Sequence, residues 1–256
     1  MWLEIGAKRV FTATGGRDFD PGLPAVVLVH GAGGDHSVWD VQSRGLAEGG
    51  RAVLAPDLPG HGYSDGPALT SITALADWLT RLLDAAGLGR AALIGHSMGA
   101  LAALDAAARH PERVRAVALL GAAAAMPVHG DLLTAARDDV PTAAAMITAW
   151  GYCADHPPAP EIVRRDRSLL ESSAPGVLHA DLAACDGYRD GQSAAAELRC
   201  PATVIVGGND RMSHPKAGSA LAEAIAASRT IVLADTGHMM MAERPQAVLD
   251  ALLTAV

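Results

Sequence analysis

The feature that most constrains the fold of this chain is a regular alternation of short apolar runs with longer helical patterns. The clearest run is the continuous Ala-Val-Val-Leu-Val stretch at 25–29, which leads at once into the Gly-rich sequence 30–34. A strand that is apolar on both faces is typical of a parallel sheet covered by helices on both sides. Five further runs share this character, and most of them lead into a loop rich in Gly or Asp: 52–55, 91–94, 114–120, 203–206 and 229–233.

Helical patterns fill the spaces between these runs. Apolar residues recur at helical spacing in 72–86, 100–109 and 245–253. The first of these segments follows Thr70 and Ser71, which are candidates for a helix cap. Because parallel strands need long crossover connections, the alternation predicts an α/β fold in which helices flank a mostly parallel central sheet.

Residues 126–196 break this rhythm. They contain no convincing strand run, whereas 131–150 and 161–172 have helical composition. We interpret the segment as a helical insertion into an otherwise continuous α/β unit. The predicted domains are a core at 1–125 and 197–256 and a helical cap at 126–196.

Charge and composition narrow the classes of partner. The formal net charge is -8, and Lys and Arg are scattered without a basic stripe, so nucleic acid would find no complementary surface. Charges interrupt the apolar stretches near the N-terminus, and the apolar run at 116–128 is shorter than the roughly 18 residues that span a bilayer. We therefore expect a cytoplasmic protein with no nucleic-acid or membrane partner.

The three cysteines point to no metal or disulfide framework. Cys153, Cys185 and Cys200 have neither the close spacing of a zinc knuckle nor an even count. Apolar neighbours around Cys200 favour simple burial over an activated thiolate. We expect all three to be reduced structural thiols.

The sequence Gly-His-Ser-Met-Gly at 95–99 is the strongest chemical signal. It matches G-x-S-x-G directly after the strand predicted at 91–94 and directly before the helix predicted at 100–109. A tight strand-to-helix turn strains its central residue, and glycines on either side avoid clashes with a Cβ. Ser97 is therefore a candidate nucleophile, and the alternative is an ordinary N-cap serine.

A nucleophilic serine needs a base and an orienting carboxylate. Asp210 follows the strand predicted at 203–206, and His238 follows the strand predicted at 229–233. The chain order Ser, Asp, His is the one expected when strand ends of a hydrolase sheet supply a triad. Asp235 is a weaker candidate acid, because it lies only three residues before His238. Taken singly, Asp210 could instead be a turn residue and His238 a structural loop histidine.

Four blocks of sequence together carry a family resemblance. They are His-Gly-Ala-Gly-Gly at 30–34 with Trp39, Asp-Leu-Pro-Gly-His-Gly-Tyr-Ser at 57–64, the serine block at 95–99, and Gly-Gly-Asn-Asp at 207–210 with Gly237-His238. Over nearly its full length the chain resembles serine-nucleophile members of the α/β-hydrolase superfamily, in particular carboxylesterase-like enzymes with a helical cap. The resemblance implies an oxyanion hole made by the backbone N–H groups of Ala32 and Met98, a cap that acts as a lid, and no metal or organic cofactor.

Other histidines and glycines have competing interpretations. His30 and His61 could suggest a metal site but lack a third ligand at a convincing spacing, so we favour roles in bracing loops. The Gly31–Gly34 cluster fits neither a P-loop nor a dinucleotide loop, so no nucleotide cofactor is expected. The predicted substrate pocket is lined by His30, Gly31, His96, Met126, Trp150 and Met239. For the methionines and the tryptophan, ordinary core packing is the alternative.

These observations predict a serine hydrolase that cleaves carboxylic esters or lactones of small apolar acyl groups through an acyl-enzyme. Two other enzymes would use the same triad, namely a carbon–carbon bond hydrolase and a perhydrolase-type enzyme. A non-catalytic ligand-binding protein of the same fold is a further alternative. The expected partner is a small molecule, and the chain could be a monomer or a homodimer.

Overall fold

A computed structural model describes residues 1–256 and contains one eight-stranded sheet with the strand order β1-β2-β4-β3-β5-β6-β7-β8. β1 pairs with β2, and β2 with β4, in antiparallel fashion, while all other neighbours are parallel. The mostly parallel α/β sheet predicted from the sequence is thus confirmed. The strands are β1 (Trp2–Ile5), β2 (Lys8–Ala13), β3 (Ala25–Val29), β4 (Ala52–Pro56), β5 (Ala91–His96), β6 (Val114–Leu120), β7 (Ala202–Gly207) and β8 (Ser228–Leu233).

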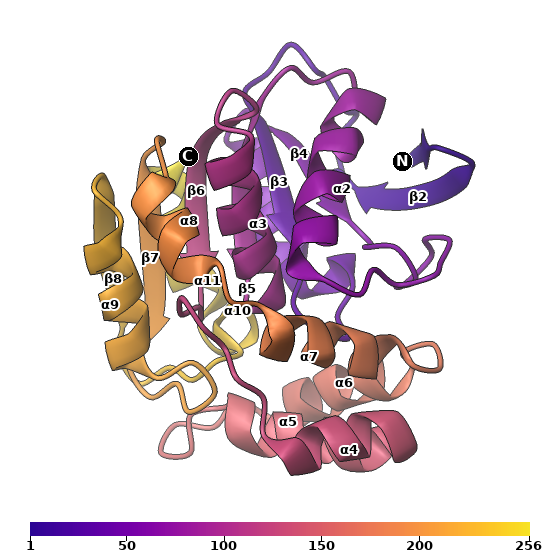
Figure 1. Ribbon diagram of the computed structural model, residues 1–256, viewed down its shortest axis with the longest axis vertical. Coiled ribbons are helices and arrows are strands. Elements are labelled where there is room, and N and C mark those ends of the chain that lie inside the picture. The colour runs from indigo at the N-terminus through magenta and orange to yellow at the C-terminus, as the bar shows by residue number, and fades with distance from the viewer.

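Helices cover both faces of the sheet, as its uniformly apolar strands require. Along β3, Val27 and Val29 face one apolar core, and Val26 and Leu28 face the other. Figure 1 shows α2 and α3 in front of the sheet. The helices on the first face are α2 (Ile72–Ala85), α3 (Met98–Arg109), α8 (Gly191–Glu197) and α9 (Pro215–Ala224). The elements on the second face are η1 (His36–Trp39), α1 (Asp40–Glu48), α10 (Met240–Glu243) and α11 (Pro245–Ala255).

The helices of the insertion form a separate layer beyond the carboxyl ends of the strands (Figure 1). They share a small apolar cluster that includes Leu132, Ile147 and Leu182. The members of the layer are α4 (Gly130–Asp138), α5 (Val140–Gly151), α6 (Pro160–Glu171) and α7 (Val177–Gly187). The helix α8 packs instead on α3 and α9, so the layer ends at α7, and the division at 126–196 stays a prediction.

Several elements were not expected from the sequence. The strands β1 and β2 carry charged residues such as Lys8 and Arg9 and have no continuous apolar run, because much of their surface faces solvent. The helical segment at 131–150 divides into α4 and α5 at Asp139, whose extended backbone and carboxylate cap the second helix through Thr142. The helices α1, α7 and α9 were also not expected from the sequence.

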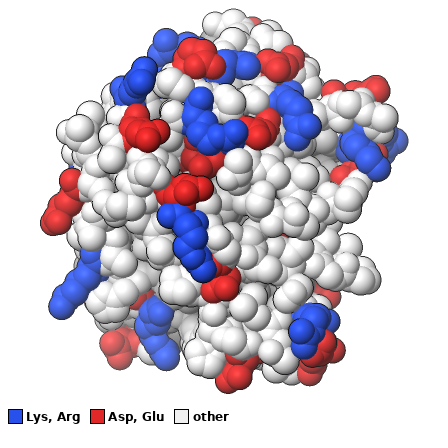
Figure 2. Space-filling model, viewed as in Figure 1, with Lys and Arg blue, Asp and Glu red and all other residues white.

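The surface and the cysteines agree with the composition. Acidic and basic side chains are interspersed on the face seen in Figure 2, and no basic stripe crosses it. Cys153, Cys185 and Cys200 are all buried and form no disulfide, as expected. Every helix falls short of the length and apolar character that crossing a membrane would demand.

Candidate active site

The turn from β5 to α3 holds Ser97 in a strained conformation. Ser97 has φ 53° and ψ −118°, and its side chain makes no capping hydrogen bond to α3. A positive φ is costly for a residue with a Cβ, and such strain is concentrated at functional sites. The interpretation of Ser97 as an ordinary N-cap serine is therefore wrong.

The two glycines that flank this turn are required by backbone contacts. A Cβ on Gly95 would lie 2.2 Å from the carbonyl oxygen of Gly99. A Cβ on Gly99 would lie 2.3 Å from the carbonyl oxygen of Val29 on β3. The glycine spacing in the sequence thus reflects how closely the first turn of α3 approaches β5 and β3.

His238 and Asp210 form a buried pair at the ends of β8 and β7. His238 Nδ1 donates to Asp210 Oδ2 over 2.8 Å, and both residues are only 2% exposed. The other carboxylate oxygen accepts the N–H groups of Met212 and Ser213, each at 2.8 Å. Burial raises the pKa of Asp210, but the charge and hydrogen bond of His238 and the two amides outweigh it, so the pKa is lowered. Asp210 is thus a carboxylate at neutral pH.

Asp235, the weaker candidate acid, lies elsewhere. Its carboxylate is exposed and lies 3.5 Å from Nε2 of His156. No hydrogen bond joins it to His238, whose Nδ1 is occupied by Asp210. A residue three positions before His238 in a tight loop therefore does not reach the ring.

The loop after β3 passes directly beside Ser97. A Cβ on Gly31 would lie 3.2 Å from the Cβ of Ser97, which is a tight contact, so the glycine eases this close approach. Ala32 lines the cavity with Ser97, and its N–H donates to no other protein group. Met98 is buried at the first position of α3, where helical N–H groups have no partner within the helix. Both amides are thus in the region expected for an oxyanion hole.

Two cavities meet at Ser97. The first, here called the apolar cavity, has a volume of about 80 Å³, and the second cavity has a volume of about 350 Å³. Both are lined by Ala32, Ser97, Leu182, Met212 and His238. Besides the shared residues, the apolar cavity is lined by the side chains of Val38, Ile147, Leu169, Leu170, Met239 and Met241, and also by the paired charges of Arg165 and Asp166. The second cavity adds Met126, Val128, His129, Leu132, Trp150 and Arg211.

The predicted pocket residues divide between these cavities, with one exception. Gly31, His96 and Met239 line the apolar cavity, and Met126 and Trp150 line the second. His30 lines neither, so its placement in the pocket is wrong. It is fully buried, its Nε2 accepts the N–H of Leu58 at 3.1 Å, and its Nδ1 donates to the Gly31 carbonyl at 2.9 Å. The predicted role in bracing loops is confirmed.

His96 connects the serine turn to the loop of His238. Its Nε2 donates to the backbone carbonyl of His238 at 2.9 Å, and the two rings lie 4.7 Å apart. Burial and the neighbouring His238 lower the pKa of His96 to about 3, so its ring is neutral. The second nitrogen, Nδ1, faces Gly31 at the wall of the apolar cavity.

A clamp that sequence analysis missed ties the His238 loop to the end of α5. The buried carboxylate of Glu243 accepts the N–H groups of Gly237 at 3.0 Å and Cys153 at 2.9 Å. The carbonyl of Gly151 accepts the N–H groups of His238 at 2.7 Å and Met239 at 3.0 Å. The position of His238 is therefore fixed partly by the insertion.

Gly121 is a second residue that the sequence did not single out. It follows β6 at φ 56°, and a Cβ there would lie 3.1 Å from His238 Nδ1. A lone glycine after a strand gives no signal of this contact. The cap residues that line the cavities were missed for a related reason, since nothing in the sequence says which face of each cap helix turns toward the core.

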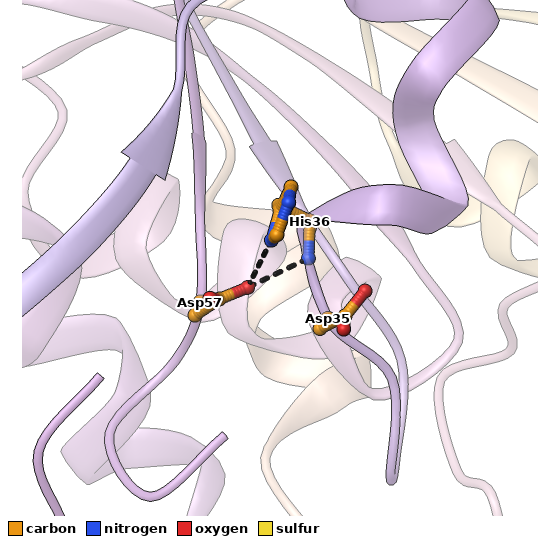
Figure 3. A group of neighbouring side chains, drawn as sticks. All are labelled: Asp35, His36 and Asp57. Atoms are coloured by element: carbon orange, nitrogen blue, oxygen red, sulfur yellow. Dashed lines mark hydrogen bonds and ion pairs between the residues drawn. The ribbon is translucent and has the colours of Figure 1, made fainter. Parts of the chain in front are cut away.

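Only one cluster has the composition of a metal site, and its ligand atoms already have partners. Figure 3 shows Asp57 Oδ1 accepting both the backbone N–H of His36, at 2.8 Å, and its Nδ1–H, at 2.7 Å. Asp57 Oδ2 accepts the N–H of Tyr63, and Asp35 accepts two hydrogen bonds from Ser37. The three residues Asp35, His36 and Asp57 thus brace the loops after β3 and β4.

Comparisons of this chain with known proteins agree on one family. A family model described as "Alpha/beta hydrolase family" matches residues 26–251. The enol-lactonase of Burkholderia xenovorans LB400 superposes with a TM-score of 0.89 and 27% identity, covering 99% of this chain and 98% of that one. A 2-hydroxymuconate semialdehyde hydrolase of Pseudomonas sp. (strain CF600) is 28% identical over 94% of this chain and 89% of its own length.

Another relative is longer than this chain. The dihydrolipoyllysine-residue acetyltransferase component of an acetoin cleaving system from Pseudomonas putida is 29% identical over 98% of this chain. The match spans only 65% of that protein's length. The rest of that protein has no counterpart here.

The glycine contacts at the Ser97 turn give a stability prediction. Gly99→Ala should lower the free energy of unfolding by at least about 2 kcal/mol, because α3 or β3 must shift to admit the methyl group. Gly89→Ala is the matched control, since a Cβ there meets nothing within 4 Å. Urea unfolding of both variants measures the difference, and equal unfolding midpoints would contradict the packing argument.

Proposed function

Because the chain belongs to the alpha/beta hydrolase family, we propose that it is a serine hydrolase that cleaves carboxylic esters or lactones. In this proposal Ser97 is the nucleophile, His238 the general base and Asp210 the residue that orients the base. The observation that carries it is the buried 2.8 Å hydrogen bond between Asp210 and His238, on the wall of the cavities into which the strained Ser97 turn opens. A serine hydroxyl is protonated at neutral pH and needs an adjacent base of this kind to act as a nucleophile.

The geometry supports a two-step acyl transfer. With Nδ1–H donated to Asp210, Nε2 of His238 is the nitrogen that accepts the Ser97 proton as Oγ attacks the substrate carbonyl. The N–H groups of Ala32 and Met98 stabilise the oxyanion, helped by the N-terminus of α3. His238 then protonates the leaving alcohol. Water deprotonated by the same imidazole releases the acid and restores Ser97.

The cavities favour a small, largely apolar acyl group. Leu169, Leu170 and Met241 belong to the wall of the apolar cavity, and methionine adapts to several ligand shapes. In a lactone the acyl group and the alcohol stay joined after the ring opens, so a single hydroxy-acid product would extend from one cavity into the other. The similar enol-lactonase supports lactones as substrates.

Carbon–carbon bond hydrolysis is the second candidate. Its support is the relative named 2-hydroxymuconate semialdehyde hydrolase, since a semialdehyde of that name holds no ester to cleave. A perhydrolase-type reaction and a ligand-binding role have no observation of their own in their favour. A cytoplasmic location and the choice between monomer and homodimer remain predictions.

The charge of the second cavity favours one kind of substrate group. Arg211 lines it and takes part in no ion pair, and no Asp or Glu lines this cavity. His129 also lines this cavity, and its Nδ1 lies 3.7 Å from a carboxylate oxygen of Asp131. We expect a substrate group with negative charge to be favoured on this side of Ser97.

Hydrolysis of p-nitrophenyl esters of increasing chain length and of simple lactones tests the proposed function. Ser97→Ala should lower kcat by at least about 10⁴-fold, because no other group can form the acyl-enzyme. A fluorophosphonate should label wild type and not the variant. Labelling without turnover would shift support to carbon–carbon cleavage, and absence of labelling would favour a binding protein.

Arg211→Gln tests the charge preference of the second cavity. Wild type should hydrolyse 3-carboxyphenyl butanoate up to about fivefold more efficiently, in kcat/KM, than 3-carbamoylphenyl butanoate, as expected for a partly exposed charge pair. The variant should lose this preference and keep its activity on the neutral ester. Arg189→Gln, remote from both cavities, is the control, and an unchanged ratio in Arg211→Gln would contradict the assignment.

A further inference from the structure

One buried carboxylate of the cap contacts both glycine-rich loops beside the site. Asp181, on α7, is 1% exposed. Its Oδ2 accepts the N–H of Gly33 at 2.8 Å and the Nε2–H of His61 at 2.7 Å. Gly33 follows Ala32 directly in the chain, so the cap holds the peptide next to the proposed oxyanion hole.

His61 balances the charge of this carboxylate. Its Nδ1 faces the carbonyl of Pro59 at 3.1 Å, which can only accept a hydrogen bond. Burial lowers the pKa of His61, but the hydrogen bond and charge of Asp181 outweigh it, so the pKa is raised. The two residues therefore form an ion pair that links α7 to the loop after β4.

His30 fixes the other side of Ala32. Its ring lies 4.8 Å from the ring of His61, and burial together with the charge of His61 lowers the pKa of His30 to about 3. Neutral His30 accepts at Nε2 from Leu58, so its proton is on Nδ1, which donates to the Gly31 carbonyl. The N–H of Gly34 donates to the same carbonyl at 3.1 Å.

These contacts determine the direction of the Ala32 amide. In a trans peptide the carbonyl of one residue and the N–H of the next point in opposite directions. The hydrogen bond from His30 fixes the Gly31 carbonyl, so the Ala32 N–H of the same peptide points in the opposite direction. The hydrogen bond from the Gly33 N–H to Asp181 fixes the plane of the next peptide. The leucines Leu170 and Leu178 pack against Gly33 so closely that a Cβ there would lie 3.0 and 2.8 Å from them.

We propose that Asp181 is a positioning residue for the oxyanion hole, acting from the cap on the Ala32–Gly33 peptide and paired with His61. The inference rests on the proposed function, because it assigns Asp181 a part in the reaction of Ser97. Its consequence is that the oxyanion hole is complete only when α7 is docked on the core. Asp181 touches no reacting atom, and its effect passes through Gly33.

Kinetics of Asp181→Ala, Asp181→Asn and the matched control Asp186→Asn test this proposal. Asp186 is on the same helix and accepts a backbone N–H from Val128 in the wall of the second cavity, but it makes no hydrogen bond to either glycine-rich loop. Asp181→Ala should lower kcat for p-nitrophenyl butanoate by about 10- to 100-fold with KM changed less than about threefold, because misplaced oxyanion donors weaken transition-state binding. Asp181→Asn, which keeps one acceptor for Gly33, should recover part of the loss. Asp186→Asn should stay within about twofold of wild type.

Fluorophosphonate labelling separates the possible outcomes. A folded Asp181→Ala protein, by circular dichroism, with wild-type kcat and labelling rate would overturn the positioning role. If Asp186→Asn lost as much stability and activity as Asp181→Ala, the proposal would also be overturned. Any defect in the cap would then lower the activity, and the contact with Gly33 would have no special part. If Asp181→Ala does not fold, Asp181→Asn and His61→Gln give the same comparison. A wild type that neither turns over esters nor labels would instead remove the proposed function itself.

The ion pair also predicts a pH dependence of stability. Asp181 of α7 and His30 of the loop after β3 are the titratable groups that face His61. Because the folded pKa of His61 is raised above 6.5, its contribution is complete below pH 6.5 and is lost as pH rises through the folded pKa. The Tm difference between wild type and His61→Gln should therefore shrink as the pH rises above 6.5 and through the folded pKa of His61. A difference that grows with pH would contradict a charged His61.

Discussion

The contact of the first turn of α3 with the backbone of β3 is the constraint on which the site depends. Gly99 places its α-carbon where a methyl group would overlap the carbonyl oxygen of Val29, and Gly95 does the same toward Gly99. The close approach forces Ser97 to positive φ and sets the start of α3 beside the loop after β3. Strain at one residue is tolerated because the fully buried strands and α3 around it cannot move apart without losing core contacts.

The four buried histidines around this turn differ in charge because their neighbours differ. His30 and His96 each donate one N–H to a backbone carbonyl and face another histidine, and both are neutral. His61 faces a carboxylate and a carbonyl and is charged. His238 has a carboxylate on one nitrogen and the cavity on the other. Similar rings thus perform different tasks according to the acceptors that surround them.

The core was readable from the sequence because its strands are apolar on both faces and its loops follow them directly. Ser97, Asp210 and His238 could be singled out for that reason, since parallel strand ends meet at one edge. The roles of Asp181 and Glu243 could not be predicted from the sequence. Each carboxylate binds a backbone amide far away along the chain, and a backbone amide has no sequence signature. His30 was predicted both to line the pocket and to brace a loop, because a histidine beside a glycine-rich loop can face either way. In the structure it braces the loop and lines neither cavity.

The attachment of the cap limits which other caps this core could accept. Gly151 on one side, and Asp181 on the other, supply the acceptors for the core amides of His238, Met239 and Gly33. An unpaired buried amide costs about 1–3 kcal/mol, so a foreign insertion that lacked these acceptors would destabilise the core as well as alter the substrate cavity. Evolution or design can therefore vary the faces of α4 to α7 that line the cavities far more freely than the two ends at which the cap is joined.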